Sequence, residues 1–376
     1  MKILHLLSYH LVTGPAEPVL ALIAAQRASG HDSQLACDTV RKGDLVETAQ
    51  RAGIPVDRRF ALCSKSGPIL LMRDVLAFKR LFREQEVDVV HSHRSHDHTL
   101  VALARPRKTN VGLVRTLHTQ RSLGQKRDWQ LRHADGLITI ARRHRRELQE
   151  RGVMPPDRIV AVEGAVDCER FSPGEGGMEV RGQAGVPADA PVAGMVARMK
   201  PGRGHQLLLR AWLRVSDKLP GVRLLVAGRG ELEQELRRQA DQSGLKSSVT
   251  FIGYRQDLPR VYRALDLKVL LAPGNDGTCR AALEAMASGV PVLAAERGAL
   301  GEIVRDGQTG RVVPADDPDA LVSALVRLLG DRQGLAEMGR RARAEAESRF
   351  TIERQAGEIE GLYRLVSGPD NPVLPR

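Results

Sequence analysis

Two acidic side chains, Asp276 and Glu284, stand in a short segment whose neighbouring residues also suit ligand binding. The apolar run 267–273 before it is typical of a buried strand, and the polar residues 274–277 predict a turn. An alanine-rich helix should follow. Gly277 would let the backbone approach a ligand, and the helix N-terminus after it would offer free N–H groups to a phosphate. A phosphate beside carboxylates that accept hydrogen bonds from hydroxyls suggests a sugar nucleotide.

Two cations, Arg198 and Arg203, lie five residues apart in a glycine-containing loop between an expected strand and an expected helix. Taken alone, such a pair is usually part of a basic surface loop. No Walker A pattern occurs, which excludes the phosphate loop of that class of NTPases. The acidic pair has plainer interpretations too. It can be an N-capping aspartate with a solvated glutamate, or the two carboxylates of a glycoside hydrolase.

Histidines gather in the N-terminal half of the chain. His118 follows the expected strand 112–117, and both a structural and a catalytic role are open for it. The segment 91–98 holds four histidines and one aspartate, but the H-x-H-x-D-H pattern of a metallo-β-lactamase would need aspartate where Ser95 stands. We therefore expect no metal site there, and we interpret the segment as a polar cleft loop near the acceptor.

Strand-like apolar runs alternate with helical patterns along the whole chain, which predicts an α/β fold with doubly wound parallel sheets. The length of 376 residues favours two domains. Residues 172–191 are rich in glycine and proline, as a linker would be. We place an N-terminal domain at 1–171, a C-terminal domain at 172–350, and a final helix and tail at 351–376.

The net charge of +12 is concentrated in the first half, where residues 1–168 contribute +9. Nucleic acid is not supported as a partner, because only 3% of the residues are aromatic and no recognition motif accompanies the charge. Anionic lipid is the more economical partner. Residues 69–83 read as an amphipathic helix edged with cations, whose apolar side belongs to the core or, alternatively, to a membrane interface. Four scattered cysteines, with neither a signal peptide nor a spanning run, indicate the cytoplasm.

The segment 276–292 resembles the signature E-G-x-x-x-x-x-x-E-A-M-A-x-G-x-P-V of the retaining glycosyltransferases of family 4 (group 1), which have the GT-B fold. Its first glutamate is Asp276 here. Residues 196–204 are similar to the family's V-G-R-L-x-x-x-K-G, with Arg203 where lysine is usual. Residues 14–17 resemble its G-G-x-E turn, with proline in place of the second glycine. The resemblance covers nearly the whole chain.

This resemblance implies a role for each matched residue. Glu284 would accept hydrogen bonds from the ribose, and Asp276 from hydroxyls of the donor sugar. Arg198 and Arg203 would stabilise the departing diphosphate. His118 would contact the donor sugar, and Gly14 would contact a phosphate or the acceptor. The diphosphate would accept hydrogen bonds from backbone N–H groups of Gly277, Thr278, Cys279 and Arg280. The turn that contains Tyr254 is expected to line the nucleotide's base.

The resemblance implies two Rossmann-like domains that face a central cleft, with the nucleotide sugar mainly on the C-terminal domain and the acceptor on the basic N-terminal domain. The tail would pack back on the N-terminal domain. We expect a metal-independent hexosyltransferase without a cofactor, which uses a UDP- or GDP-sugar as co-substrate and acts with retention on a cell-envelope glycan or glycolipid. We also expect the protein to be cytoplasmic and to bind peripherally to the inner face of the cytoplasmic membrane. Two alternatives stay open: a non-catalytic sugar-nucleotide-binding partner subunit, and a GT-B nucleotide-sugar epimerase.

Overall fold

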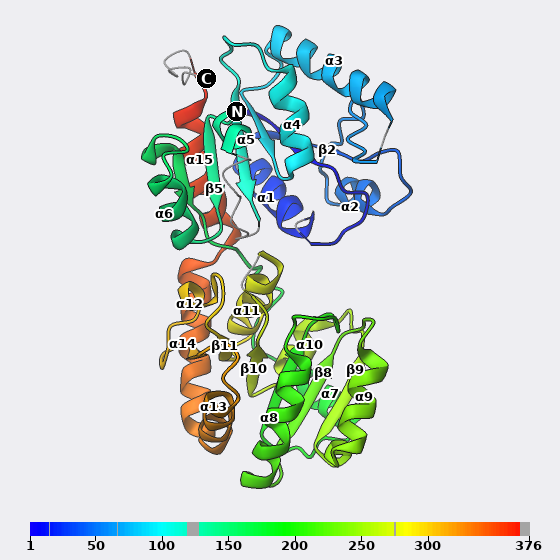
Figure 1. Cartoon of the computed structure of the whole chain (residues 1–376), viewed down its shortest axis with the longest axis vertical. Helices are drawn as coiled ribbons and strands as arrows, with labels where there is room; N and C mark the ends of the chain where they lie inside the picture. The colour runs from blue at the N-terminus through cyan, green and yellow to red at the C-terminus, as the bar shows by residue number, and fades with distance from the viewer. Residues whose placement is uncertain (15, 66, 119–127, 274–275, 369–376) are drawn as a thin grey trace. The chain divides into compact units, whose positions relative to one another are not determined.

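The computed structural model describes residues 1–14, 16–65, 67–118, 128–273 and 276–368, and the side chains of 128–129 and 276–278 lie outside this description. The chain packs as two compact units (Figure 1). The first is formed by residues 1–164 together with the segment from Ile352 onward, and the second by residues 165–351. Each unit is built on a parallel six-stranded sheet covered by helices. The predicted α/β fold with two Rossmann-like domains is therefore confirmed.

The first unit has the strand order β2-β1-β3-β4-β5-β6. Its strands are β1 (Lys2–Leu7), β2 (Asp32–Cys37), β3 (Val89–Ser92), β4 (Gly112–Leu117), β5 (Gly136–Thr139) and β6 (Ile159–Ala161). Its helices are α1 (Ala16–Ala28), α2 (Leu45–Arg51), α3 (Pro68–Glu84), α4 (Ser95–Ala104), α5 (Asp128–Arg132), α6 (Arg142–Glu150), the 3₁₀ turn η2 (Pro156–Arg158) and α15 (Ile352–Val366).

The second unit has the strand order β12-β11-β10-β7-β8-β9. Its strands are β7 (Val192–Val196), β8 (Arg223–Ala227), β9 (Val249–Gly253), β10 (Leu267–Leu270), β11 (Val292–Ala295) and β12 (Gly310–Val313). Its helices are α7 (Gly177–Gln183), α8 (His205–Lys218), α9 (Glu233–Gln242), η3 (Leu245–Ser247), α10 (Leu258–Arg263), α11 (Asp276–Ala287), α12 (Leu300–Ile303), α13 (Pro318–Gly330) and α14 (Arg332–Arg349).

Each sheet has one point where the strand order reverses. In the first unit the chain adds β2 on one side of β1 and then β3 on the other, so that β1 and β3 flank the reversal. In the second unit β7 and β10 flank it in the same way. Loops that leave the carboxyl ends of two such strands diverge, and the crevice between them is where ligands of doubly wound sheets bind. The fold thus marks one candidate half-site in each unit.

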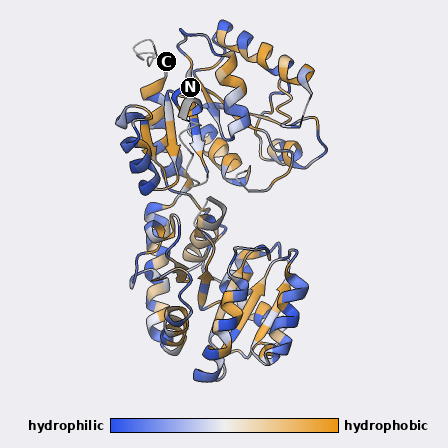
Figure 2. Cartoon of the chain, in the orientation of Figure 1, coloured by the Kyte–Doolittle hydropathy of each residue, from blue (hydrophilic) through white to orange (hydrophobic). Residues whose placement is uncertain are grey.

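The strands are apolar because helices cover both faces of each sheet. All six residues of β4 are buried, whereas the edge strand β12 exposes Arg311. Figure 2 shows this division, with hydrophobic strands between helices whose outer faces are hydrophilic, most strongly at α6. No helix in the described ranges combines the length and the apolar character that crossing a bilayer requires.

Helix α15 belongs to the first unit although it comes last in the chain (the red helix in Figure 1). It lies against α1, β4 and β5. Two glycines permit this approach: a Cβ added at Gly112 would stand 2.7 Å from the carbonyl oxygen of Val366, and one at Gly136 would stand 3.0 Å from Leu362. The close packing of α15 against β4 and β5 therefore requires glycine, which has no side chain, at both positions.

Two details of the expected domain organisation differ from the structure. Residues 165–171, which we assigned to the first domain, pack in the second unit, where Arg343 donates hydrogen bonds to the carbonyls of Cys168 and Phe171. The expected linker 172–191 contains helix α7. That helix is held by Arg181, which is buried and donates to the carbonyl of Ala264 at 2.9 Å. The glycine and proline content of this segment did not indicate that a buried arginine would hold a helix there.

Candidate functional site

The half-site of the second unit begins in the loop after β7, which carries Arg198 and Arg203. This loop ends at Gly204, the N-cap of α8, with φ +87°. A Cβ at Gly204 would stand 2.4 Å from the Cβ of Leu271 after β10, so only glycine permits this close approach. The end of the loop after β7 is therefore packed against the first residue after β10.

The two arginines differ in exposure. Arg198 is exposed, and Arg203 is half-buried. Burial, followed by the positive charge of Arg198, lowers the pKa of Arg203 from its ordinary value. Two guanidiniums that raise each other's electrostatic energy favour a bound anion, and arginine matches the geometry of phosphate oxygens. The structure thus brings together the two cations that the sequence marked as a pair.

Two more groups that carry or can gain positive charge lie in this region, and sequence reasoning missed both. Lys268 of β10 is fully buried, and its Nζ donates to the carbonyl of Val196 at 3.2 Å. Burial lowers its pKa to about 7, against the opposing effect of Glu284. His205, the first residue of α8, has a pKa lowered to about 4 by burial and then by Lys268 and Arg203. The available signal was one lysine inside the apolar run 267–273.

Glu284 lies on α11 and is 7% exposed. Its Oε2 accepts a hydrogen bond from the hydroxyl of Tyr262 at 2.9 Å, and its Oε1 is 3.4 Å from Nε of Arg280. Burial first, and then the charge of Glu284, raises the pKa of Tyr262 well above its ordinary value, so the phenol stays a donor. Tyr262 and Arg280 hold the carboxylate in one orientation.

The remaining residues of the signature segment lie at the start of α11. The helix begins at Asp276, so Gly277 belongs to its first turn and not to the preceding turn that we predicted. The side chains of Asp276 and Thr278 lie outside the described residues. Cys279 is 2% exposed, so its backbone, not its thiol, is what this turn can present.

Tyr254 follows β9 and is 57% exposed. The guanidinium of Arg229, from the loop after β8, lies 4.5 Å from the centre of its ring. These loops leave the carboxyl ends of the strands, as do those that carry the arginine pair, but β8 and β9 lie beyond β7 from the strand-order reversal. Tyr254 therefore stands at the side of the half-site.

The half-site of the first unit lies around the carboxyl ends of β1, β3 and β4. Gly14 has φ +59° and precedes α1. Nearby, Arg94 donates to the carbonyl of Ser8 at 2.7 Å and lies 4.3 Å from the ring centre of Tyr9. His118 directly follows β4, and its Nε2 is 3.1 Å from Nδ1 of His93. Gly14 and His118 thus belong to loops at the same edge of the sheet.

The histidine-rich segment is not the polar loop that we expected. His91 lies in β3, His98 lies in α4, and both are fully buried. His98 is satisfied within the unit, by the hydroxyl of Ser92 at 2.9 Å and the carbonyl of Gln130 at 2.7 Å. No local sequence pattern indicates that Ser92 of β3 and Gln130 of α5 supply these partners.

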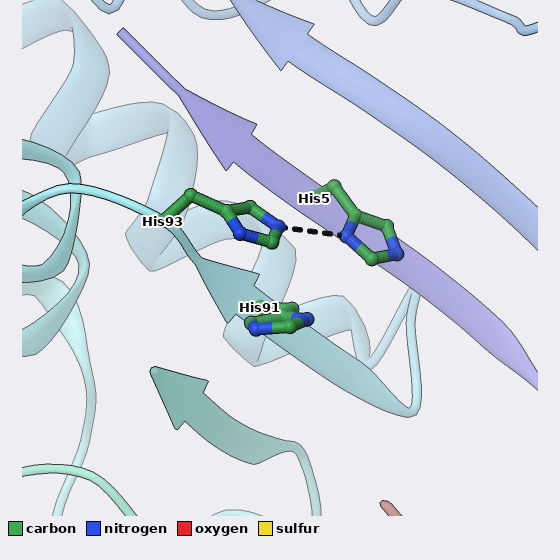
Figure 3. A group of neighbouring side chains, drawn as sticks. All are labelled: His5, His91 and His93. Atoms are coloured by element: carbon green, nitrogen blue, oxygen red, sulfur yellow. Dashed lines mark hydrogen bonds between the residues drawn. The ribbon is translucent and has the colours of Figure 1, made fainter. Parts of the chain in front are cut away.

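A different group of histidines comes together across the sheet. Ring nitrogens of His5, His91 and His93 lie within 4.8 Å of one another, a spacing that one metal ion could bridge. Figure 3 shows His5 on β1 beside His93, which follows β3, with His91 next to them. Both nitrogens of each ring already have hydrogen-bond partners, so an ion would have to displace these. The arrangement favours a hydrogen-bonded cluster.

A cavity of about 300 Å³ in the second unit is not part of the half-site. Its lining includes Pro191, Asp266 and Pro291, which immediately precede β7, β10 and β11. It therefore opens at the amino ends of the strands, opposite the edge that carries the arginine pair. The candidate site in the second unit is therefore identified by its charged residues and not by the volume of this cavity.

Comparison with known proteins agrees with this architecture. Residues 12–170 match the family model described as Glycosyltransferase Family 4, and residues 190–331 match that described as Glycosyl transferases group 1. The D-inositol 3-phosphate glycosyltransferase of Corynebacterium aurimucosum is 30% identical over 315 residues, which are 77% of this chain and 74% of that protein. The enzyme of the same name from Corynebacterium glutamicum is 31% identical over 249 residues, which are 64% of this chain but only 59% of that protein.

Among solved structures, a glycosyltransferase from Rickettsia africae superposes with a TM-score of 0.84 at 17% identity and covers 97% of this chain and 98% of its own. At that identity the likeness is one of fold. The sequence matches and the two doubly wound domains lead to one assignment: the chain belongs to the group 1, family 4 glycosyltransferases, which have the GT-B fold.

Proposed function

We propose that the protein transfers a hexose from a UDP- or GDP-sugar to a cell-envelope glycan or glycolipid, with retention of the anomeric configuration and without a metal. This proposal rests mainly on the pair Arg198 and Arg203, which lies at the strand-order reversal of the second sheet, and on the oriented carboxylate of Glu284 on the helix after β10. Cations suit a diphosphate, and a buried carboxylate that accepts hydrogen bonds suits a ribose.

The proposed chemistry needs no nucleophile from the protein. The bond between the anomeric carbon and the leaving phosphate oxygen breaks as the acceptor hydroxyl attacks from the same face. The acceptor's proton passes to the departing phosphate. Arg198 and Arg203 stabilise the negative charge that develops there, which is the term that contributes most to such a reaction. Asp276 and His118 are assigned to the donor sugar's hydroxyls, and Gly14 to the acceptor side.

The proposed acceptor is carried by a membrane surface. Helix α3 buries one face, with Phe78, Leu81 and Phe82 in the core. On the opposite face, Ile69 is 83%, Met72 61% and Leu76 56% exposed. Cations flank this exposed face, namely Arg73, Lys79, Arg80 and Arg83. Apolar side chains ringed by cations fit an anionic bilayer, which is the interfacial alternative of the two that the sequence left open.

The function is tested first by thermal unfolding with UDP-, GDP- and ADP-sugars and the free diphosphates. A ligand at 100 times its Kd stabilises the folded state by about 2.7 kcal/mol, so one nucleotide class should raise Tm. The shift should disappear in Glu284→Ala. Turnover is then measured with that donor and lipid-linked or polyol phosphate acceptors, with the product's anomeric configuration determined by NMR and with EDTA present. Nucleotide released without glycosylated product would indicate the epimerase, and binding without any turnover would indicate the partner subunit.

The membrane contact is tested by co-sedimentation with vesicles of phosphatidylglycerol and of phosphatidylcholine. We expect binding to the anionic vesicles that weakens with salt. Met72→Asp together with Leu76→Asp should abolish it. Met178→Asp is the matched control, because Met178 is 57% exposed on α7 of the other unit. Equal binding by the control and the α3 variant would refute the assignment.

A further inference from the structure

A chain of hydrogen bonds runs through the interior of the first unit and ends at His118. It starts at Gln26 of α1, whose Oε1 is 2.8 Å from Nε2 of His5. Nδ1 of His5 is 3.0 Å from Nε2 of His93, and Nδ1 of His93 is 3.1 Å from Nε2 of His118. Gln26, His5 and His93 are at most 4% exposed. Figure 3 shows the central link, between His5 and His93.

The chemistry of these groups gives the chain a direction. A neutral imidazole carries one hydrogen, so it donates with one nitrogen and accepts with the other. The amide oxygen of Gln26 can only accept, so Nε2 of His5 carries the hydrogen and Nδ1 accepts. Nε2 of His93 must then donate to His5, which leaves Nδ1 of His93 as an acceptor. Nε2 of His118 is consequently a donor.

The neighbouring bonds are consistent with the orientation of the Gln26 amide that sets this direction. Its oxygen also accepts from the hydroxyl of Ser33 at 3.0 Å, and its NH₂ group donates to the hydroxyl of Tyr363 at 3.3 Å. That hydroxyl in turn lies 2.6 Å from Nδ1 of His91. Nε2 of His91 then donates to the hydroxyl of Thr116 at 2.7 Å. Every hydrogen of this second branch has a place that is consistent with the first.

The rings inside this hydrogen-bond chain are held neutral, so each has one nitrogen that donates and one that accepts. Burial lowers the pKa of His5 to about 4 and the pKa of His91 and His93 well below the ordinary value. The positive charges that these rings could gain would also repel one another. Within the described residues, none of the hydrogen-bond partners of these three rings is a carboxylate that would favour an imidazolium.

We propose that Gln26 is a positioning residue that, through His5 and His93, keeps a hydrogen on Nε2 of His118, so that Nδ1 is the nitrogen that accepts a hydrogen bond from a hydroxyl of the donor sugar. This inference rests on the proposed function, which assigns His118 to the donor. It adds which nitrogen of His118 acts and which residues decide it. In this proposal the histidine cluster determines which nitrogen of His118 carries the hydrogen, and it does not bind a metal.

The test is ¹⁵N NMR of the whole protein labelled at histidine, at pH 7.5, with signals assigned by single histidine substitutions. In the neutral ring of His118 we expect the hydrogen on Nε2. A hydrogen on Nδ1 would overturn the proposal, as would stoichiometric zinc in the purified protein with metal-bound imidazole signals. The tautomer of His118 in the wild-type protein is measured without turnover, so this test is independent of whether the protein transfers a sugar.

A variant then tests the role of Gln26. Gln26→Leu removes the amide oxygen that lies 2.8 Å from Nε2 of His5, so His5, His93 and His118 should populate both tautomers. We expect kcat with the donor to fall about tenfold, the equivalent of one hydrogen bond, with unchanged affinity for the free nucleotide diphosphate. Gln355→Leu is the control, because Gln355 of α15 donates to the carbonyl of Glu163 and takes no part in the series of hydrogen bonds that ends at His118. Unchanged tautomers in folded Gln26→Leu, or the same change in the control, would refute the assignment.

Discussion

At the scale of single residues, the arginine pair is the feature on which the proposed chemistry depends most directly. Arg198→Ala and Arg203→Ala should each lower kcat by roughly 10²–10³-fold, because each removes a preorganised positive charge from the departing diphosphate. Steady-state kinetics with a saturating donor measures this. Arg214→Ala is the control, since Arg214 pairs with Asp319 on the surface at 2.6 Å. Normal turnover in Arg198→Ala would contradict the mechanism.

Tyr262 offers a graded test of the ribose site. Tyr262→Phe removes the hydroxyl that donates to Glu284 at 2.9 Å but leaves the carboxylate in place. A hydrogen bond to a charged group contributes about 1.5–3 kcal/mol, of which only a part should reach the ligand, so we expect a weakening of nucleotide binding of about tenfold or less. Glu284→Ala should weaken it more. Isothermal titration calorimetry measures both, and an equal loss in the two variants would mean that Tyr262 contacts the nucleotide itself.

The residues that sequence reasoning found and missed differ in a physical respect. Arg198 and Arg203 stand in a loop and Glu284 stands in helix α11, each within a recognisable sequence spacing, so their chemistry could be predicted from the sequence. Lys268 and Gln26 act from within buried elements, where a polar side chain is defined by neighbours distant in sequence. His5 and His91 are paired across β1 and β3, a register that no local pattern reveals.

At the scale of elements, most strands and helices were predictable because parallel strands buried on both faces are almost continuously apolar. Helix α7 was missed because its glycines suggest a linker, whereas its stability comes from Arg181, which is also paired with Asp266 at 3.0 Å. The retention of α15 by the first unit was expected only from the family resemblance. The structure adds its cause, which is the absence of side chains at Gly112 and Gly136.

That cause yields a prediction about α15. Gly112→Ala would place a Cβ 2.7 Å from the backbone oxygen of Val366, so the helix must shift, at a cost of about 1–3 kcal/mol of unfolding free energy. Hydrogen–deuterium exchange should show faster exchange in α15. Gly361→Ala on α15 itself is the matched control: its added Cβ meets nothing within 4 Å, and it should stabilise the helix by about 0.5–1 kcal/mol. Slower or unchanged exchange in Gly112→Ala would refute the account.

At the scale of the whole molecule, the two units repeat one arrangement but divide the chemistry. Each places its polar residues at the strand-order reversal of a parallel sheet. The first unit holds neutral histidines at that place, and the second holds the arginine pair together with the buried amine of Lys268, whose pKa burial lowers to about 7. Charge collected in a folded interior has a cost in stability, and this cost should make the stability of the second unit depend on pH in a specific window.

Lys268 sets that window. Its pKa is about 7 in the folded chain and roughly 10.4 in an unfolded one. Between these values the unfolded chain binds a proton that the folded chain lacks, so the free energy of unfolding should rise with pH from about 7 to about 10 and level off below 7. Lys268→Met should flatten this slope and stabilise the second unit at neutral pH.

Urea denaturation can follow the second unit alone. Trp212 is buried there, and replacing the other tryptophan, Trp129, with phenylalanine leaves Trp212 as the single fluorescent reporter. Lys218→Met, on the exposed end of α8, is the control and should keep the slope of the parent protein. If Lys268→Met also kept that slope, Lys268 would be charged in the folded state at neutral pH. The second unit would then hold a buried ammonium as a third cation of the diphosphate site, and Lys268→Met should weaken nucleotide binding instead.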